Sequence, residues 1–273
     1  FSLSRGLGDV YKRQNKNKPN LLSKNYIPNF TAGLTFFIAV AATNLFHQGN
    51  WQRVYAAKNN HVLKKSLLFS FLVIIPIVYM MGFTGLVSVS KNLNVTPDLA
   101  FFSLLINEEI FTLSVIVIVL ALSLTISSID TLINAISSLI IVDGKKILRS
   151  NKDYLKLSRN IIIGLSFIAL YVASKGFSIL YLFLLADLFC CAAVLSIFYS
   201  FYSKSFSEKT AYISIIVGLL GGILLFPSPD FSKSILAGIL FPASYFPEFV
   251  TQSLLFLSFI AATLLPVLTW KVK

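Results

Sequence analysis

Seven stretches of the sequence are dominated by Leu, Ile, Val, Phe and Ala, and most of them reach about 18 residues or more. About 20 such residues cross the hydrocarbon core of a bilayer as an α-helix. A membrane β-barrel would show short segments that alternate in polarity, whereas these runs are continuous. The sequence therefore predicts an all-α polytopic membrane protein with about seven transmembrane helices. The predicted spans are residues 30–46, 66–89, 111–142, 160–173, 177–201, 211–226 and 251–270.

Composition supports a membrane protein. Charged residues make up only 12% of the chain, about half of the share in a typical soluble domain. The net charge of +12 would suggest nucleic acid in a soluble protein. Here the basic residues cluster in short loops between apolar runs, which is typical of membrane proteins. We therefore expect the chain to interact with the lipid bilayer and not with nucleic acid. The two cysteines are adjacent within an apolar run and predict no disulfide framework.

The distribution of Lys and Arg predicts the orientation of the chain. Fourteen of these residues fall in the loops after the first, third, fifth and seventh predicted spans, and the other loops from residue 30 onward hold three. Short cytoplasmic loops carry the excess of positive charge. We therefore expect a multi-pass protein of the plasma membrane or bacterial inner membrane with a cytoplasmic C-terminus.

The start of the chain differs from the remainder of the sequence. Residues 1–14 (FSLSRGLGDVYKRQ) fit no later pattern, and we expect them to be a non-native, adapter-derived leader. Residues 15–29 are then the remnant of an extracellular loop. Their basic stretch lies on the wrong side for the predicted orientation, which upstream helices missing from a truncated protein would explain.

A polar stripe runs along the third predicted span. Its members recur every three or four residues, which places them on one face of a helix. Lipid cannot satisfy such groups, so the stripe must face a cavity or other helices. The stripe consists of Ser123, Ser127, Asp130, Asn134, Ser137 and Ser138.

The stripe has more than one interpretation. Serines alone often mediate helix packing in membranes. Asp130 favours function, because a carboxylate at mid-depth is expensive. Hydroxyls, a carbonyl and a carboxylate are oxygen ligands for a hard monovalent cation. Asp130 could also pair with a basic residue, or carry a proton in a relay with Ser123 and Asn134.

Two further places carry polar groups in or near the membrane. Asp187 lies within the fifth predicted span, where it is either a hydrogen-bonded structural residue or a gate or substrate contact. The end of the first span is densely polar and is the second candidate for the substrate cavity or gate. Its candidate residues are Thr43, Asn44, His47 and Gln48.

Two segments together resemble the sodium:solute symporter family, which includes sodium–sugar, proline, pantothenate and urea-type transporters. The first is HQGNWQRVYAAKN at residues 47–59, and the second is LALSLTISSIDTLINAISSLIIVDGKKIL at residues 120–148. The resemblance covers residues 30–204. It implies a C-terminal fragment of an inverted-repeat fold of five plus five helices, with sites near the midplane.

On this resemblance, residues 30–202 correspond to core helices 6–10 and residues 203–273 to helices outside the core. Core helix 8 holds sodium, the coupling ion, through two neighbouring hydroxyls and a carbonyl one turn earlier, at positions that match Ser127, Ser128 and Leu124. The remaining ligands belong to helices that precede this segment. The implied function is sodium-coupled symport of a small polar solute, and we expect the fragment alone neither to bind sodium tightly nor to transport.

Two alternatives stay open. One is proton-coupled transport through Asp130, and another is a transporter-like membrane sensor. A membrane enzyme would need a converging acid, base or metal set, and the sequence offers none, so we expect no catalytic residues.

Overall fold

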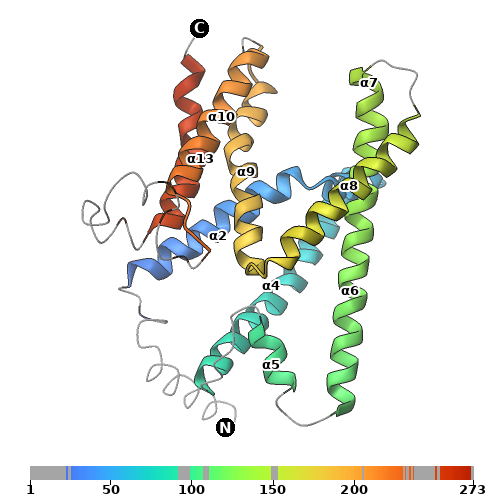
Figure 1. Ribbon diagram of the computed structural model, residues 1–273, viewed down its shortest axis with the longest axis vertical. Coiled ribbons are helices and arrows are strands. Elements are labelled where there is room, and N and C mark those ends of the chain that lie inside the picture. Colours follow the sequence, from blue (N-terminus) through green and yellow to red (C-terminus); the bar gives the residue numbers. More distant parts are fainter. Residues whose placement is uncertain are drawn as a thin grey trace. The chain divides into compact units, whose positions relative to one another are not determined.

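The structure is a computed structural model, and Figure 1 traces its helices. It describes residues 23, 26–91, 99–106, 111–148, 153–204, 206–229, 231, 234, 236, 250 and 253–271. The expected leader and most of the expected loop remnant before residue 30 lie outside these residues. The described residues form two compact units. Unit 1 holds Gln48–Gly176, unit 2 holds Phe177–Lys273 together with the helix before Gln48, and each is described by itself.

Unit 1 consists of helices throughout its described residues. Two of them begin at side-chain caps that occupy free backbone N–H groups. The side chain of Asn59 accepts a bond from the amide of Val62, and that of Asp153 accepts from Leu155 and Lys156. The helices are α3 (Gln48–Ala56), α4 (Asn60–Ser90), α5 (Ala100–Ile106), α6 (Phe111–Ser138), α7 (Gly144–Leu148) and α8 (Tyr154–Ser174).

The long third span continues beyond its predicted end. A π-helical segment, η2 (Leu139–Asp143), joins α6 to α7. The apolar helix therefore runs over 36 residues, Phe111–Lys146. It was predicted as one helix over residues 111–142, and the π-turn was not foreseen because no Gly or Pro marks it.

Unit 2 is built from α2 (Ile27–Phe46), α9 (Ile179–Ser200), α10 (Glu208–Leu225), α13 (Leu254–Leu268) and a short 3-10 turn, η4 (Thr269–Lys271). In Figure 1, α10 and α13 run side by side next to α9, and α2 crosses them obliquely. The core includes Leu184, Leu188, Cys191, Phe226 and Phe259, each at most 1% exposed. Among the described residues, unit 2 is more tightly packed than unit 1: 44% of the α9 span is buried, against at most 6% of any span in unit 1.

Helices α10 and α13 approach each other through small residues. A Cβ atom added at Gly218 would lie 2.7 Å from the carbonyl oxygen of Ala262, and one at Gly222 would lie 2.9 Å from the Ala262 Cβ. The Ser214 and Thr269 hydroxyls bond each other over 2.5 Å. Small residues allow such close backbone contact in membrane helices.

Six of the described helices are long and apolar enough to cross a membrane, by length and composition. They correspond to the first six predicted spans. The seventh, predicted over residues 251–270, is the 15-residue helix α13, which falls short of the usual length for a crossing. The predicted turn between the fourth and fifth spans is present, and Gly176 adopts a φ of 66°, a region that glycine tolerates best.

Candidate functional site

The polar stripe of α6 is present on one helix of unit 1. Ser123, Ser127, Asp130 and Asn134 are all exposed within the described residues of this unit. On a helix apolar enough to cross a membrane, exposed hydroxyls and a carboxylate need polar surroundings that lipid does not supply. The N-terminal part of the stripe, from Ser123 to Asn134, is therefore open for a further polar partner.

Two of the three predicted sodium ligands are in direct contact. The Ser128 hydroxyl donates a hydrogen bond of 2.9 Å to the carbonyl oxygen of Leu124. The Ser127 carbonyl accepts a similar bond from Thr131, while the Ser127 side chain stays exposed. A hydroxyl that donates its proton to the helix keeps lone pairs for a cation. Ser128 Oγ and Leu124 O are thus oxygen acceptors held together by the local helix geometry.

Asp130 has a polar neighbour on its own helix. The side-chain amide of Asn134 donates a bond of 3.3 Å to the Asp130 carboxylate, one turn away. The described part of the chain contains no ion pair with Asp130; the pair it does contain joins Lys146 and Asp143 on the exposed end of the helix. The predicted pairing of Asp130 with a basic residue is therefore not seen among the described residues.

The C-terminal end of the stripe packs against other helices of unit 1. The Ser158 hydroxyl of α8 donates to Ser137 over 3.2 Å. The side-chain amide of Gln52, in α3, lies 3.5 Å from the Ser138 hydroxyl. Ser137 and Ser138 therefore act in helix packing. Ser158 and Gln52 were not predicted as their partners, because nothing in the sequence links these positions.

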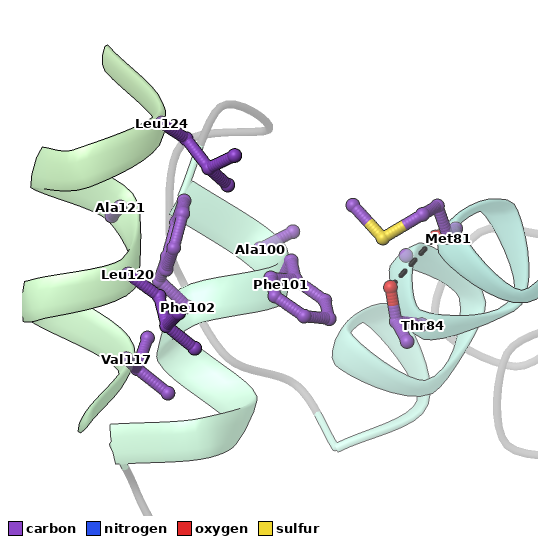
Figure 2. Close-up of a pocket in the computed structure, with 10 residues that line it drawn as sticks. Met81, Thr84, Ala100, Phe101, Phe102, Val117, Leu120, Ala121 and Leu124 are labelled. Carbon is purple, nitrogen blue, oxygen red and sulfur yellow. Dashed lines mark hydrogen bonds between the residues drawn. The ribbon is translucent and has the colours of Figure 1, made fainter. Parts of the chain in front are cut away.

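A cavity of about 540 Å³ lies beside the N-terminal half of α6, between α4, α5 and α6. Figure 2 shows Phe101 and Phe102 of α5 between Leu120 and Leu124 on one side and Met81 and Thr84 on the other. Among the described lining residues only Thr84 carries a hydroxyl, and it donates to the Met81 carbonyl over 2.6 Å. The lining suits apolar groups and offers little to a polar solute.

In unit 2, the structure brings two predicted residues together from distant parts of the sequence. The Thr43 hydroxyl of α2 donates a hydrogen bond of 2.5 Å to Oδ1 of Asp187 on α9. Asp187 is only 7% exposed. A buried carboxylate needs such donors, because an unpaired charge is costly in a low-dielectric interior. The Cys190 thiol, one turn further along α9, interacts with the same Thr43 hydroxyl.

The other residues predicted near Thr43 are not part of this pair. The Asn44 side chain is exposed, and its amide donates back to the Val40 carbonyl of the same helix. His47 follows the last residue of α2, and its Nδ1 is buried without a hydrogen-bond partner among the described residues. Gln48 begins α3 and belongs to unit 1.

The described residues contain no cluster of three or more His, Cys, Asp or Glu side chains that could hold a metal ion. A sodium ion does not need such a cluster, because hydroxyl and carbonyl oxygens suit hard cations. The groups present on α6 fit one side of such a site.

Several long apolar helices, with polar groups at intervals along two of them, define the chain as a multi-pass integral membrane protein of the all-α class. No known family model, curated protein or solved structure matches the chain. The resemblance to the sodium:solute symporter family therefore rests on the two sequence segments alone.

Proposed function

We propose that the chain is part of a sodium-coupled symporter for a small polar solute, as the resemblance to the sodium:solute symporter family implies. The observation that carries the proposal is the contact between Ser128 Oγ and the Leu124 carbonyl beside the exposed Ser127. Three oxygen groups on one turn of a membrane-spanning helix are suitable ligands for a cation. The site would be completed by oxygens from other helices of the full transporter.

In this proposal the helices within residues 30–202 belong to an inverted-repeat core. Helices α2, α6 and α9 take the places of core helices 6, 8 and 10, and α10 and α13 lie outside the core. The protein would lie in a plasma membrane or bacterial inner membrane with its C-terminus in the cytoplasm, and residues 251–270 would make the seventh crossing.

The Thr43–Asp187 bond has a role in this scheme. It joins α2 to α9 by a side-chain contact between residues 144 positions apart. Opening that bond would expose the Asp187 carboxylate and the Thr43 hydroxyl together. A polar solute could then bond to both groups and replace the bond between them. Sodium and solute would then shift the transporter between its outward-facing and inward-facing states through their different affinities for the two.

Solute uptake by the product of the complete gene, including all coding sequence upstream of residue 1, tests the proposal. Proteoliposomes with and without an inward sodium gradient would be compared across a panel of labelled small solutes. We expect sodium-dependent uptake that Ser127→Ala with Ser128→Ala reduces by at least ten-fold, about 1.4 kcal/mol of lost ion binding.

Ser166→Ala provides a matched control. Ser166 is an exposed serine on α8 whose hydroxyl donates to the Ile162 carbonyl over 2.9 Å, the same local bond that Ser128 makes. Its loss should leave sodium dependence unchanged. Uptake that ignores sodium, or equal effects of the two sets of variants, would contradict sodium binding at Ser127 and Ser128.

Proton coupling through Asp130 is a second candidate. The observation that favours it is the Asp130 carboxylate itself, because an ionisable group exposed on a helix apolar enough to cross a membrane is a candidate proton carrier. Proton coupling predicts that Asp130→Asn abolishes uptake driven by a pH gradient while sodium has no effect. Sodium coupling predicts uptake without a pH gradient.

A further inference from the structure

A second cavity, of about 220 Å³, lies within unit 2 at the N-terminal ends of α2 and α13. Its walls come from the first turns of α2, the start of α13 and the segment after α10. It is separate from the Thr43–Asp187 pair, because Thr35, its last residue on α2, precedes Thr43 by about 12 Å of helix. None of the residues predicted as functional lines it.

The cavity carries hydroxyl groups whose bonding differs. Thr35 donates its proton to the Thr31 carbonyl over 2.7 Å, and Thr31 donates to the Pro28 carbonyl over 3.2 Å. Both hydroxyls are therefore left as acceptors. Ser253 is 2% exposed, and its hydroxyl has no partner in the described structure. A buried hydroxyl without a partner costs free energy unless something binds it.

Ser253 is unusual for its position. It is the residue before the first turn of α13, where a serine side chain commonly accepts a bond from a backbone N–H, yet it makes no such bond. Because no bond fixes its hydroxyl, the side chain can rotate toward the cavity that it lines. The hydroxyl is available there both as a donor and as an acceptor.

The lining also includes a strained residue. Phe231 lines the cavity with a φ of 57°, a left-handed conformation that is uncommon for a residue with a side chain. Its ring is held edge-on against Tyr181, with centroids 6.0 Å apart. Strained residues persist where their surroundings over-determine them, and they concentrate at binding sites. Phe256 of α13 adds a second aromatic ring to the lining.

We propose that this cavity is a binding site for a small neutral solute that carries N–H or O–H donors, such as a primary amide. The Thr31 hydroxyl would accept one of its donors, Ser253 would bond its remaining polar atom, and the aromatic rings would contact its apolar face. None of the described lining residues is charged, so an ion bound among them would lose its hydration without compensation. The proposal does not depend on sodium coupling.

Four probes of four heavy atoms each separate the chemical classes. Acetamide is neutral and has donors, acetone is neutral without donors, acetate is an anion and acetamidinium is a cation. Saturation-transfer NMR on the full chain in lipid nanodiscs would measure their affinities, which are roughly millimolar for ligands of this size. We expect acetamide to bind at least five-fold more tightly than the other three.

Variants link the binding to this cavity. Ser253→Ala and Thr31→Val each remove one hydroxyl and should weaken acetamide binding about five-fold. Thr263→Val is the matched control, because Thr263 makes the same kind of bond to the Phe259 carbonyl within α13 and does not line the cavity. The melting temperature of each variant would be measured in parallel.

Each other outcome overturns the proposal. Equal binding of acetone and acetamide would show that donors are not recognised, and preferred binding of acetate or acetamidinium would show a charged site. No binding of any probe, together with a higher melting temperature for Ser253→Ala, would show a cavity that holds water only. Equal loss in Thr263→Val would place the binding elsewhere.

Discussion

The hydroxyl of Ser258 donates a hydrogen bond of 2.7 Å to the backbone carbonyl of Gly222, so a side chain of α13 bonds directly to the main chain of α10. Such a bond requires the two helix axes to lie close together. The glycines of α10 permit it, because a side chain at Gly218 or Gly222 would occupy the contact.

The substitution Gly218→Ala should therefore destabilise unit 2. The added methyl would overlap the Ala262 carbonyl and the Pro266 ring, each 2.7 Å away, and overpacking of this kind costs about 1–3 kcal/mol. Thermal unfolding in detergent would report the change. Gly164→Ala in α8 is the control, because nothing lies within 4 Å of its added methyl and a gain of up to about 1 kcal/mol is expected from helix propensity.

The contact between α2 and α9 gives a second prediction. Thr43→Val keeps the shape of the side chain and removes the donor to Asp187, leaving a buried carboxylate without that bond. The expected loss is about 1–3 kcal/mol of stability, measured by denaturant unfolding. Thr43→Ser retains the hydroxyl and should lose less. Equal stability of Thr43→Val and the unsubstituted protein would show that the bond contributes little.

The start of α8 depends on a cap. Asp153 accepts bonds of 3.1 and 3.2 Å from the amides of Leu155 and Lys156. Asp153→Ala should cost about 0.5–2 kcal/mol, and hydrogen exchange should rise first at these two amides. Asn is also a strong capping residue, so Asp153→Asn should restore most of the protection. Faster exchange confined to the end of α8 would argue against the cap.

The end of unit 2 carries an aromatic stack. Tyr199 and Trp270 lie face to face, with centroids 4.1 Å apart and planes at 12°. The indole N–H of Trp270 is buried and has no partner among the described residues. Trp270→Phe should therefore be nearly neutral, whereas Trp270→Leu should lose about 0.5–1.5 kcal/mol with the stack. Chemical unfolding would measure both, and equal losses would show that stacking contributes nothing.

The orientation predicted from Lys and Arg can be tested by labelling. Cys190 and Cys191 are the only cysteines of the chain, so a background of Cys190→Ala with Cys191→Ala accepts new single cysteines. Lys175→Cys should react with an impermeant maleimide added outside the cell, and Lys146→Cys should react only after the membrane is opened. The reverse pattern would invert the predicted topology.

The spans were predictable because long apolar runs allow few alternatives, and six of them recur as helices of sufficient length. Helix starts were less predictable. The fourth span was predicted from residue 160, but α8 begins at Tyr154 because Asp153 caps a polar first turn. Apolar periodicity does not detect such a turn. The separate helix α5 was missed for a related reason, since seven residues are too few to show a pattern.

The sequence indicated individual residues of the candidate sites, but it did not indicate which of them contact each other across helices. Thr43 and Asp187 were each predicted from polarity in an apolar span, but their bond joins helices far apart in sequence. The bond from Ser128 to Leu124 is local, so helix geometry alone places the two groups together. The sequence does not indicate the cavity at Ser253, because a serine before an apolar helix is ordinarily read as a helix cap.

The π-helical segment Leu139–Asp143 has a consequence for how the sequence of this helix can vary. A π-turn holds one residue more than an α-turn, so this segment can release a single residue locally. Deleting one residue here would convert it to regular α-helix and leave Lys145 and Lys146 on nearly the same side of the helix as before. Deleting one residue within the regular helix α6 would instead rotate them by about 100° relative to the residues before the deletion. Loss of one residue is therefore tolerated best at this segment, because the polar stripe of α6 and the lysines after the segment keep their relative positions around the helix.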